Sequence, residues 1–158
     1  MKTLAIALSV LFLTGCGTLQ QSKFAVKQGS ELATVVALQE MEATKGKAIK
    51  VHTIAVQVKD LIGPDGEIDS DVLKTEIVRA INENFEPSER LVLLLLLNNI
   101  MELVMHEIEK DPIPSEHDVL VLVHAAADGV AAGAKIYIMS LEEPSVRILN
   151  VSAENGSR

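Results

Sequence analysis

The stretch "LVLLLLLNNIMELVM", residues 91–105, restricts the fold more than any other part of the chain. It opens with seven consecutive apolar residues, so a helix here is apolar on nearly every side and needs a bundle interior or a bilayer. Asn98, Asn99 and Glu102 interrupt the run well before the roughly 18 to 20 residues that a membrane span requires. A carboxylate near the bilayer centre also costs about 2.5 to 3.5 kcal/mol. We therefore expect the centre of a soluble helical bundle, with the asparagines and Glu102 at its rim.

Apolar residues at helical spacing predict further helices before this stretch. One helical pattern contains Val51, Ile54, Ala55, Val58, Leu61 and Ile62, and a second contains Leu73, Ile77, Ile81 and Phe85. We expect the first helix to begin near Ser22 and to break or kink at Gly46, because glycine is a poor helix former. The segment "TIAVQV", residues 53–58, also alternates as a strand would, so a strand is the alternative there.

Capping and breaking residues divide the rest of the chain. The expected helices run from an N-cap at Asp69 or Ser70 to Pro87, from an N-cap at Ser88 to about Lys110, and from about Glu116 to Met139. Ser115 and Asp118 have the spacing of a capping box before the last of these helices. The prediction is an all-α bundle of four or five helices in residues 31–140, with antiparallel neighbours joined by short loops. Residues 141–158 are expected to form a C-terminal tail.

Composition narrows the classes of function. The chain has 14 Lys and Arg residues against 22 Asp and Glu residues, which gives a net charge of −8. A nucleic-acid partner is therefore not expected, because phosphate binding depends on clustered positive charge. Three Phe, one Tyr and no Trp leave few flat aromatic faces on which sugars or bases stack.

The acidic loop "PDGEIDSD", residues 64–71, is the best candidate for a metal site. Asp65, Glu67, Asp69, Asp71 and Glu76 fall at positions 1, 3, 5, 7 and 12 of a calcium loop of the EF-hand type. The glycine that such a loop needs at position 6 is replaced by Ser70. Acidic residues also gather before helices for capping alone, so we expect a turn and a helix cap, with calcium binding as the alternative.

Two other patterns lie on the last expected helix. Ala125, Gly129 and Gly133 put small residues on one helical face, which predicts a close helix crossing within the domain, with a homodimer contact as the alternative. His124 and Asp128 lie one turn apart, which is typical of a hydrogen-bonded pair at the edge of a core and less often of a catalytic or metal site. No phosphate-binding glycine loop or hydrolase motif occurs. We therefore expect a protein that is not an enzyme and needs no cofactor.

The N-terminus carries the most informative motif. An apolar core of about a dozen residues follows Lys2, which is the length of a signal peptide, and it ends in Leu13-Thr14-Gly15-Cys16. This tetrapeptide resembles the lipobox of bacterial lipoproteins. The resemblance implies that residues 1–15 are a signal peptide, that Cys16 carries a covalent diacylglycerol, and that residues 16–30 form a tether that runs into the first helix. Gly17 replaces the aspartate that keeps such proteins in the inner membrane, so the implied location is the outer membrane, facing the periplasm, if the cell is Gram-negative.

These observations predict a lipid-anchored, non-catalytic envelope protein that binds the membrane through its lipid and contacts a protein partner. Its size and lipobox also resemble, more loosely, small lipoproteins encoded by phages or prophages. Two alternatives also fit the sequence. One is a membrane-active protein with a helical hairpin in the bilayer, and the other is a calcium-responsive binding module.

Overall fold

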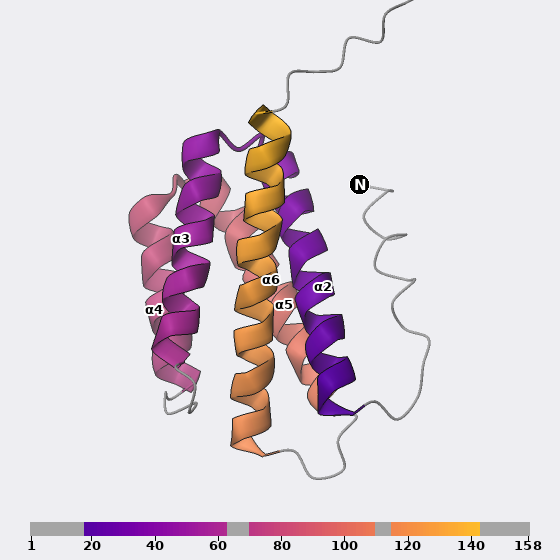
Figure 1. Cartoon of the computed structure of the whole chain (residues 1–158). Coiled ribbons are helices and arrows are strands. Elements are labelled where there is room, and N and C mark those ends of the chain that lie inside the picture. The colour runs from indigo at the N-terminus through magenta and orange to yellow at the C-terminus, as the bar shows by residue number, and fades with distance from the viewer. Residues whose placement is uncertain (1–17, 63–69, 110–114, 143–158) are drawn as a thin grey trace, which may run out of the picture.

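The computed structural model describes residues 18–62, 70–109 and 115–142, and these ranges form five α-helices. The helices are α2 (Leu19–Glu40), α3 (Lys45–Ile62), α4 (Ser70–Asn84), α5 (Pro87–Ile108) and α6 (Glu116–Glu142). Successive helices run in opposite directions, with α2, α4 and α6 pointing up in Figure 1 and α3 and α5 pointing down. The prediction of an all-α bundle is confirmed, and residues 53–58 are helical rather than extended.

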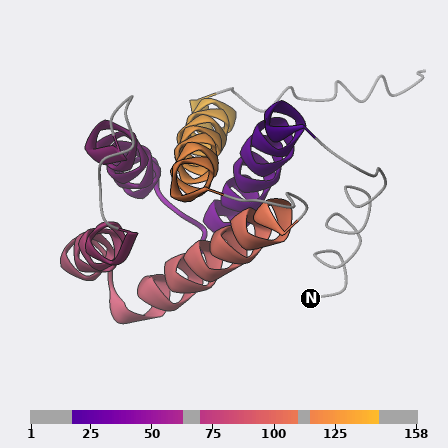
Figure 2. The same ribbon diagram turned by 90° about the horizontal axis from the view of Figure 1, so that it is seen from below.

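Helix α6, rather than α5, has the most extensive contacts in the bundle and lies between α3 and α2 (Figure 2). It packs most extensively against α2 and then α3, and it also contacts α5, as the view along the helices in Figure 2 illustrates. Helix α5 lies on the outside, where Leu91 and Leu95 are 62% and 55% exposed. The prediction that residues 91–105 form the central helix is therefore wrong. A helix rich in alanine and glycine can be approached closely on several sides, whereas the leucines of α5 keep its neighbours at a distance.

The polar residues of α5 lie at the surface of the bundle, as the sequence predicts. Asn98, Asn99 and Glu102 are all exposed. The Asn98 side-chain amide donates a hydrogen bond to Glu102 Oε1 at 2.8 Å, one turn further along the helix. These polar groups therefore remain in contact with water, while Leu93, Leu96 and Ile100 on the opposite side of the helix are buried.

Glycines of α6 set the distance between α6 and α2. A Cβ atom on Gly129 would collide with the backbone carbonyl of Lys27 and lie 2.9 Å from Ser30 Cβ. A Cβ on Gly133 would meet the carbonyl of Glu31 and lie 3.0 Å from Thr34 Cβ. The two helices thus touch backbone to backbone, which is the close crossing within the domain that the small-residue spacing predicts. Ala125, one turn before Gly129, is also buried.

The helix boundaries near the N-terminus differ from the expected ones. Helix α2 begins at Leu19 rather than near Ser22, and the Thr18 N–H before it donates to Gln21 Oε1 at 3.2 Å, as in a capping box. Residues 19–30, part of the expected tether, are therefore helical, and Val26 and Ser30 are buried. The break between α2 and α3 falls at Met41–Thr44, not at Gly46, which lies inside the first turn of α3.

The break between α2 and α3 is a Schellman motif. Glu42 adopts a left-handed backbone conformation with φ 46°, a position that usually carries glycine. The N–H of Ala43 donates to the Leu38 carbonyl and the N–H of Glu42 donates to the Gln39 carbonyl, each at 3.0 Å. These two bonds satisfy carbonyls at the end of α2. The break between α2 and α3 could therefore not be predicted from a glycine, because glutamate occupies the left-handed position.

The starts of α5 and α6 test two predicted caps. Helix α5 is capped by Glu86, with Pro87 as its first residue, so the expected N-cap at Ser88 is two residues too late. The capping box at Ser115 is confirmed, because the Ser115 N–H donates to Asp118 Oδ2 at 3.0 Å and the Asp118 N–H donates to Ser115 Oγ at 3.2 Å. Helix α6 then continues to Glu142, three residues beyond the expected end.

We expect Gly129→Ala to lower the free energy of unfolding by about 1 to 3 kcal/mol, because the new methyl group would push α6 away from the Lys27 carbonyl. Gly46→Ala is the matched control, since a Cβ at Gly46 has no neighbour closer than 3.9 Å. It should leave stability unchanged or slightly raised, because alanine is the better helix former. Urea unfolding followed by circular dichroism measures both variants. Equal effects of the two substitutions would contradict the close crossing.

Candidate functional site

An apolar cavity of about 90 Å³ lies between α3, α4, α5 and α6. The lining residues are Val51, Ile54, Ala55, Val58, Ile77, Ile81, Phe85, Leu93, Leu96, Leu97, Ile100, Met101, Val104, Val123, Ala126, Ala127 and Val130. None of these side chains carries a polar group other than the thioether of Met101. Protein interiors have few voids larger than a water molecule, so a space of this size is an unusual feature of a small domain.

The arrangement of the helices explains the cavity. Helices α4 and α5 meet at the turn near Phe85 and diverge from there, so that their other ends lie well apart in Figures 1 and 2. Helix α6 faces this space with Ala126 and Ala127, which are too small to fill it.

The cavity is partly open to solvent. Most of its lining residues are buried, but five are half-exposed: Ile54, Ile77, Leu97, Met101 and Val130. These residues come from all four helices around the cavity.

The strongest charged cluster joins three helices around Asp128 of α6. Asp128 Oδ2 pairs with Lys27 Nζ of α2 at 2.6 Å, and Asp128 Oδ1 pairs with Lys59 Nζ of α3. Hydrogen bonds from Lys27 and then Lys59 lower the pKa of Asp128 to about 2, against the opposing effect of burial. The same contact raises the pKa of Lys27. The cluster joins α2 and α3 to α6. The carboxylate of Asp128 and the two lysine ammonium groups are paired with each other.

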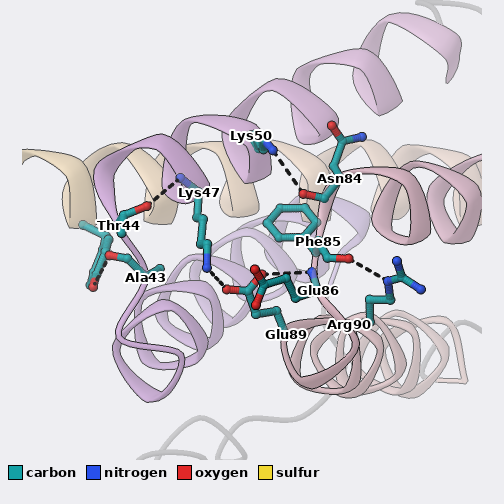
Figure 3. Close-up of polar contacts among 10 residues, drawn as sticks. Ala43, Thr44, Lys47, Lys50, Asn84, Phe85, Glu86, Glu89 and Arg90 are labelled. Carbon is teal, nitrogen blue, oxygen red and sulfur yellow. Dashed lines mark hydrogen bonds and ion pairs between the residues drawn. The ribbon is translucent and has the colours of Figure 1, made fainter.

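A second polar cluster fastens the turn before α5 to the start of α3 (Figure 3). Lys47 of α3 pairs with Glu89 of α5, and Glu89 Oε2 also accepts a hydrogen bond from the Glu86 N–H at 3.1 Å. The contact with Lys47 lowers the pKa of Glu89. Lys50 donates to the Asn84 carbonyl at 3.2 Å, and Arg90 Nε donates to the Phe85 carbonyl at 2.7 Å. These contacts cap helix ends and join α3 to the α4–α5 turn.

The predicted lipid and calcium sites fall mainly on residues that the structure does not describe. Cys16 lies outside the described residues, as do Asp65, Glu67 and Asp69, and the side chain of Asp71 is also outside them. Glu76 is described, and it pairs with Arg79 on the same helix. Among residues 18–62, 70–109 and 115–142, no three His, Cys, Asp or Glu side chains come together as metal ligands.

The expected pair of His124 and Asp128 is replaced by the lysine cluster. Both carboxylate oxygens of Asp128 have lysine partners, from α2 and α3. The spacing along one helix suggested His124 as the partner of Asp128. The actual partners, Lys27 and Lys59, are distant in the sequence and are brought to Asp128 by the packing of the helices. The sequence did offer one indication of these partners. An aspartate on an apolar stretch of helix needs an opposite charge nearby, which a neighbouring helix can supply.

Comparison of the chain with protein-family models, with curated proteins and with solved structures finds no match.

We expect the Asp128 cluster to make stability depend on pH. The pKa of Asp128 is lower in the folded protein than its ordinary value of 3.8, so the cluster stabilises the fold above about pH 4 and loses this effect as the pH falls toward 2. Because Asp128 is about one-third exposed, Asp128→Asn should lower the free energy of unfolding at pH 7 by only about 1 kcal/mol.

The measurement is urea unfolding of both proteins at pH 7 and near pH 2. The difference between them should become small at the lower pH, where the wild-type carboxyl is about half protonated. Glu76→Gln is the control, because its pair with Arg79 within one helix is worth at most about 0.5 kcal/mol. An Asp128→Asn effect of equal size at both pH values would show that the charge of Asp128 contributes nothing.

Proposed function

We propose that the protein is a lipid-anchored, non-catalytic lipoprotein of the cell envelope that acts by contacting a protein partner. The observation that carries the anchor is the tetrapeptide Leu13-Thr14-Gly15-Cys16, placed directly after an apolar run of signal-peptide length. A thioether-linked diacylglycerol on Cys16, with a further acyl chain on the new N-terminus, would give stable attachment, because one acyl chain alone binds a membrane only marginally. By the identity of Gly17, the proposed location is the outer membrane, facing the periplasm, in a cell with two membranes.

The described charged clusters support a structural rather than a catalytic use of their side chains. Asp128 is neutralised by two lysines that join helices, and Glu89 is engaged by Lys47 and by a helix cap. A catalytic acid or base needs a proton that substrate can reach and a pKa near the working pH. The pKa of Asp128, at about 2, is far below that range.

Exposed leucines on α5 offer a surface for the partner. Leu91 and Leu95 lie one helical turn apart and are both more than half exposed. Apolar side chains at the centre of an interface contribute much of the binding energy once the partner excludes water from them. We therefore place the proposed protein contact on the first half of α5.

A membrane-inserted hairpin is the second candidate. Helices α5 and α6 are both long and apolar enough to cross a bilayer by length and composition, with mean hydropathy of 1.7 and 1.6. Buried core helices pass the same test, and half of the apolar window of α6 is buried in the bundle. Inserting α6 would also separate Asp128 from Lys27 and Lys59. The proposal therefore favours the bundle anchored by lipid.

We expect Cys16→Ser to abolish both lipid labelling and membrane attachment. Cells producing either protein are fed an alkyne analogue of palmitate, and the label and the protein are followed in soluble and membrane fractions. The wild type should be labelled and sediment with membranes, whereas Cys16→Ser should be unlabelled and soluble. Absence of label on the wild type would refute the lipoprotein proposal. An unlabelled Cys16→Ser protein that resists alkaline carbonate extraction would support the hairpin instead.

The partner is tested by photocrosslinking in cells. We expect a benzoylphenylalanine placed at Leu95 to give a discrete adduct with one other protein after irradiation. The same residue at Gln57, which is exposed on α3, is the control and should give none. Adducts from both positions, or from neither, would argue against a protein contact on α5.

A further inference from the structure

One face of α2 is exposed along most of the helix. Its residues lie three or four positions apart, which places them on the same side of a helix. This outer face of α2 consists of Gln21, Phe24, Gln28 and Leu32. Phe24 is 66% exposed, more than any other large apolar side chain among the described residues, and Leu32 is 42% exposed. None of the four residues carries a charge, so the outer face holds no ion that must stay in bulk water.

The proposed lipid anchor lies very close to this face. Only Gly17 and Thr18 separate Cys16 from Leu19, the first residue of α2. Three residues span at most about 11 Å when fully extended, and five further residues of helix add about 7.5 Å. Phe24 is therefore held within about 20 Å of a lipidated Cys16 in any orientation of the bundle. A link of this length is too short to hold the bundle away from the bilayer.

The distribution of charge favours the same side of the bundle. All 22 Asp and Glu residues of the chain lie at Glu31 or later, so residues 17–30 contain none. The same segment contains Lys23, which is half-exposed, and Lys27, which is paired with Asp128. Anionic headgroups attract lysine and repel carboxylates. The start of α2 thus carries no carboxylate that a bilayer surface would repel, although the chain as a whole is acidic.

We infer that the outer face of α2 rests on the bilayer that holds the anchor, with Phe24 and Leu32 in the headgroup region. This inference rests on the proposed lipid anchor and adds the side of the bundle that faces the membrane. A helix lying in the plane of the interface buries phenylalanine and leucine there, while glutamine side chains stay hydrated among the headgroups. The contact need not be strong enough to bind a free protein, because the anchor gives α2 a high effective concentration at the surface.

Tryptophan fluorescence tests the contact, because the chain contains no tryptophan. Phe24→Trp places a single fluorophore on the outer face. The full-length lipoprotein is purified from cell membranes and reconstituted in vesicles of phosphatidylethanolamine and phosphatidylglycerol, with or without bromine on the acyl chains near the headgroup. Bromine quenches tryptophan only at close contact. We expect Phe24→Trp to lose most of its fluorescence in the brominated vesicles.

Ile49→Trp is the matched control. Ile49 is 45% exposed, but it lies on α3, on the other side of α6 from α2 (Figure 2). It should lose almost no fluorescence in the same vesicles. Circular dichroism verifies that each variant is folded. If Phe24→Trp does not fold, Leu32→Trp makes the same test two turns further along the outer face.

The outcomes separate this inference from the proposed anchor. The palmitate label is measured on the same preparations and reports the lipid on Cys16. A labelled Phe24→Trp protein that is quenched no more than Ile49→Trp would overturn the inference and leave the anchor standing. Absence of the label would overturn both. Strong quenching of Phe24→Trp alone, on labelled protein, supports the contact between α2 and the bilayer.

Discussion

The bundle depends on the contact between the backbones of α2 and α6. Gly129 and Gly133 let α6 rest directly on the carbonyl groups of Lys27 and Glu31, and dispersion forces act over the whole length of the crossing at this short distance. The same turn of α6 carries Asp128, whose carboxylate meets Lys27 of α2 and Lys59 of α3. Close approach and charge pairing therefore fix three helices at one place.

The close approach of α2 and α6 leaves one buried polar group without a hydrogen bond among the described residues. Ser30 is fully buried opposite Gly129, and its hydroxyl has no hydrogen-bond partner among the described residues. Serine is small enough to fit there, whereas most apolar residues are larger. Thr34, one turn later, avoids the same penalty because its hydroxyl donates to the Ser30 carbonyl at 2.7 Å. Small size thus outweighs the unsatisfied hydroxyl at Ser30.

The sequence predicted the fold class, a bundle of four or five helices and the small-residue crossing, because these follow from local periodicity and spacing. It placed the break after α2 wrongly, since Glu42 takes a left-handed conformation without the glycine that usually marks it. It also placed residues 91–105 at the centre, whereas α6 is the most extensively packed helix and α5 exposes Leu91 and Leu95. Hydrophobicity alone favoured the leucines of residues 91–105, whereas the position of a helix depends on how closely its neighbours can approach.

The cavity and the Asp128 cluster could not be predicted from sequence patterns, for a different reason. The cavity arises from the divergence of α4 and α5, a property of helix directions that no spacing along one helix encodes. The lysine partners of Asp128 are equally distant in the sequence. Residues such as Ile77 and Leu97 appeared only as core positions, and their role at an opening depends on what lies opposite them.

The weak attachment of α4 has a consequence for the dynamics of the domain. Helix α4 packs against α3 and α5, with far smaller contact regions than those that bind α6 to α2 and α3. Proteins open in cooperative units, and the unit with the least buried contact opens at the lowest free energy. The helix that forms one wall of the cavity is thus the one that can detach while α2, α3 and α6 remain folded. Entry to the interior then needs no permanent channel, because a brief excursion of a single helix exposes it.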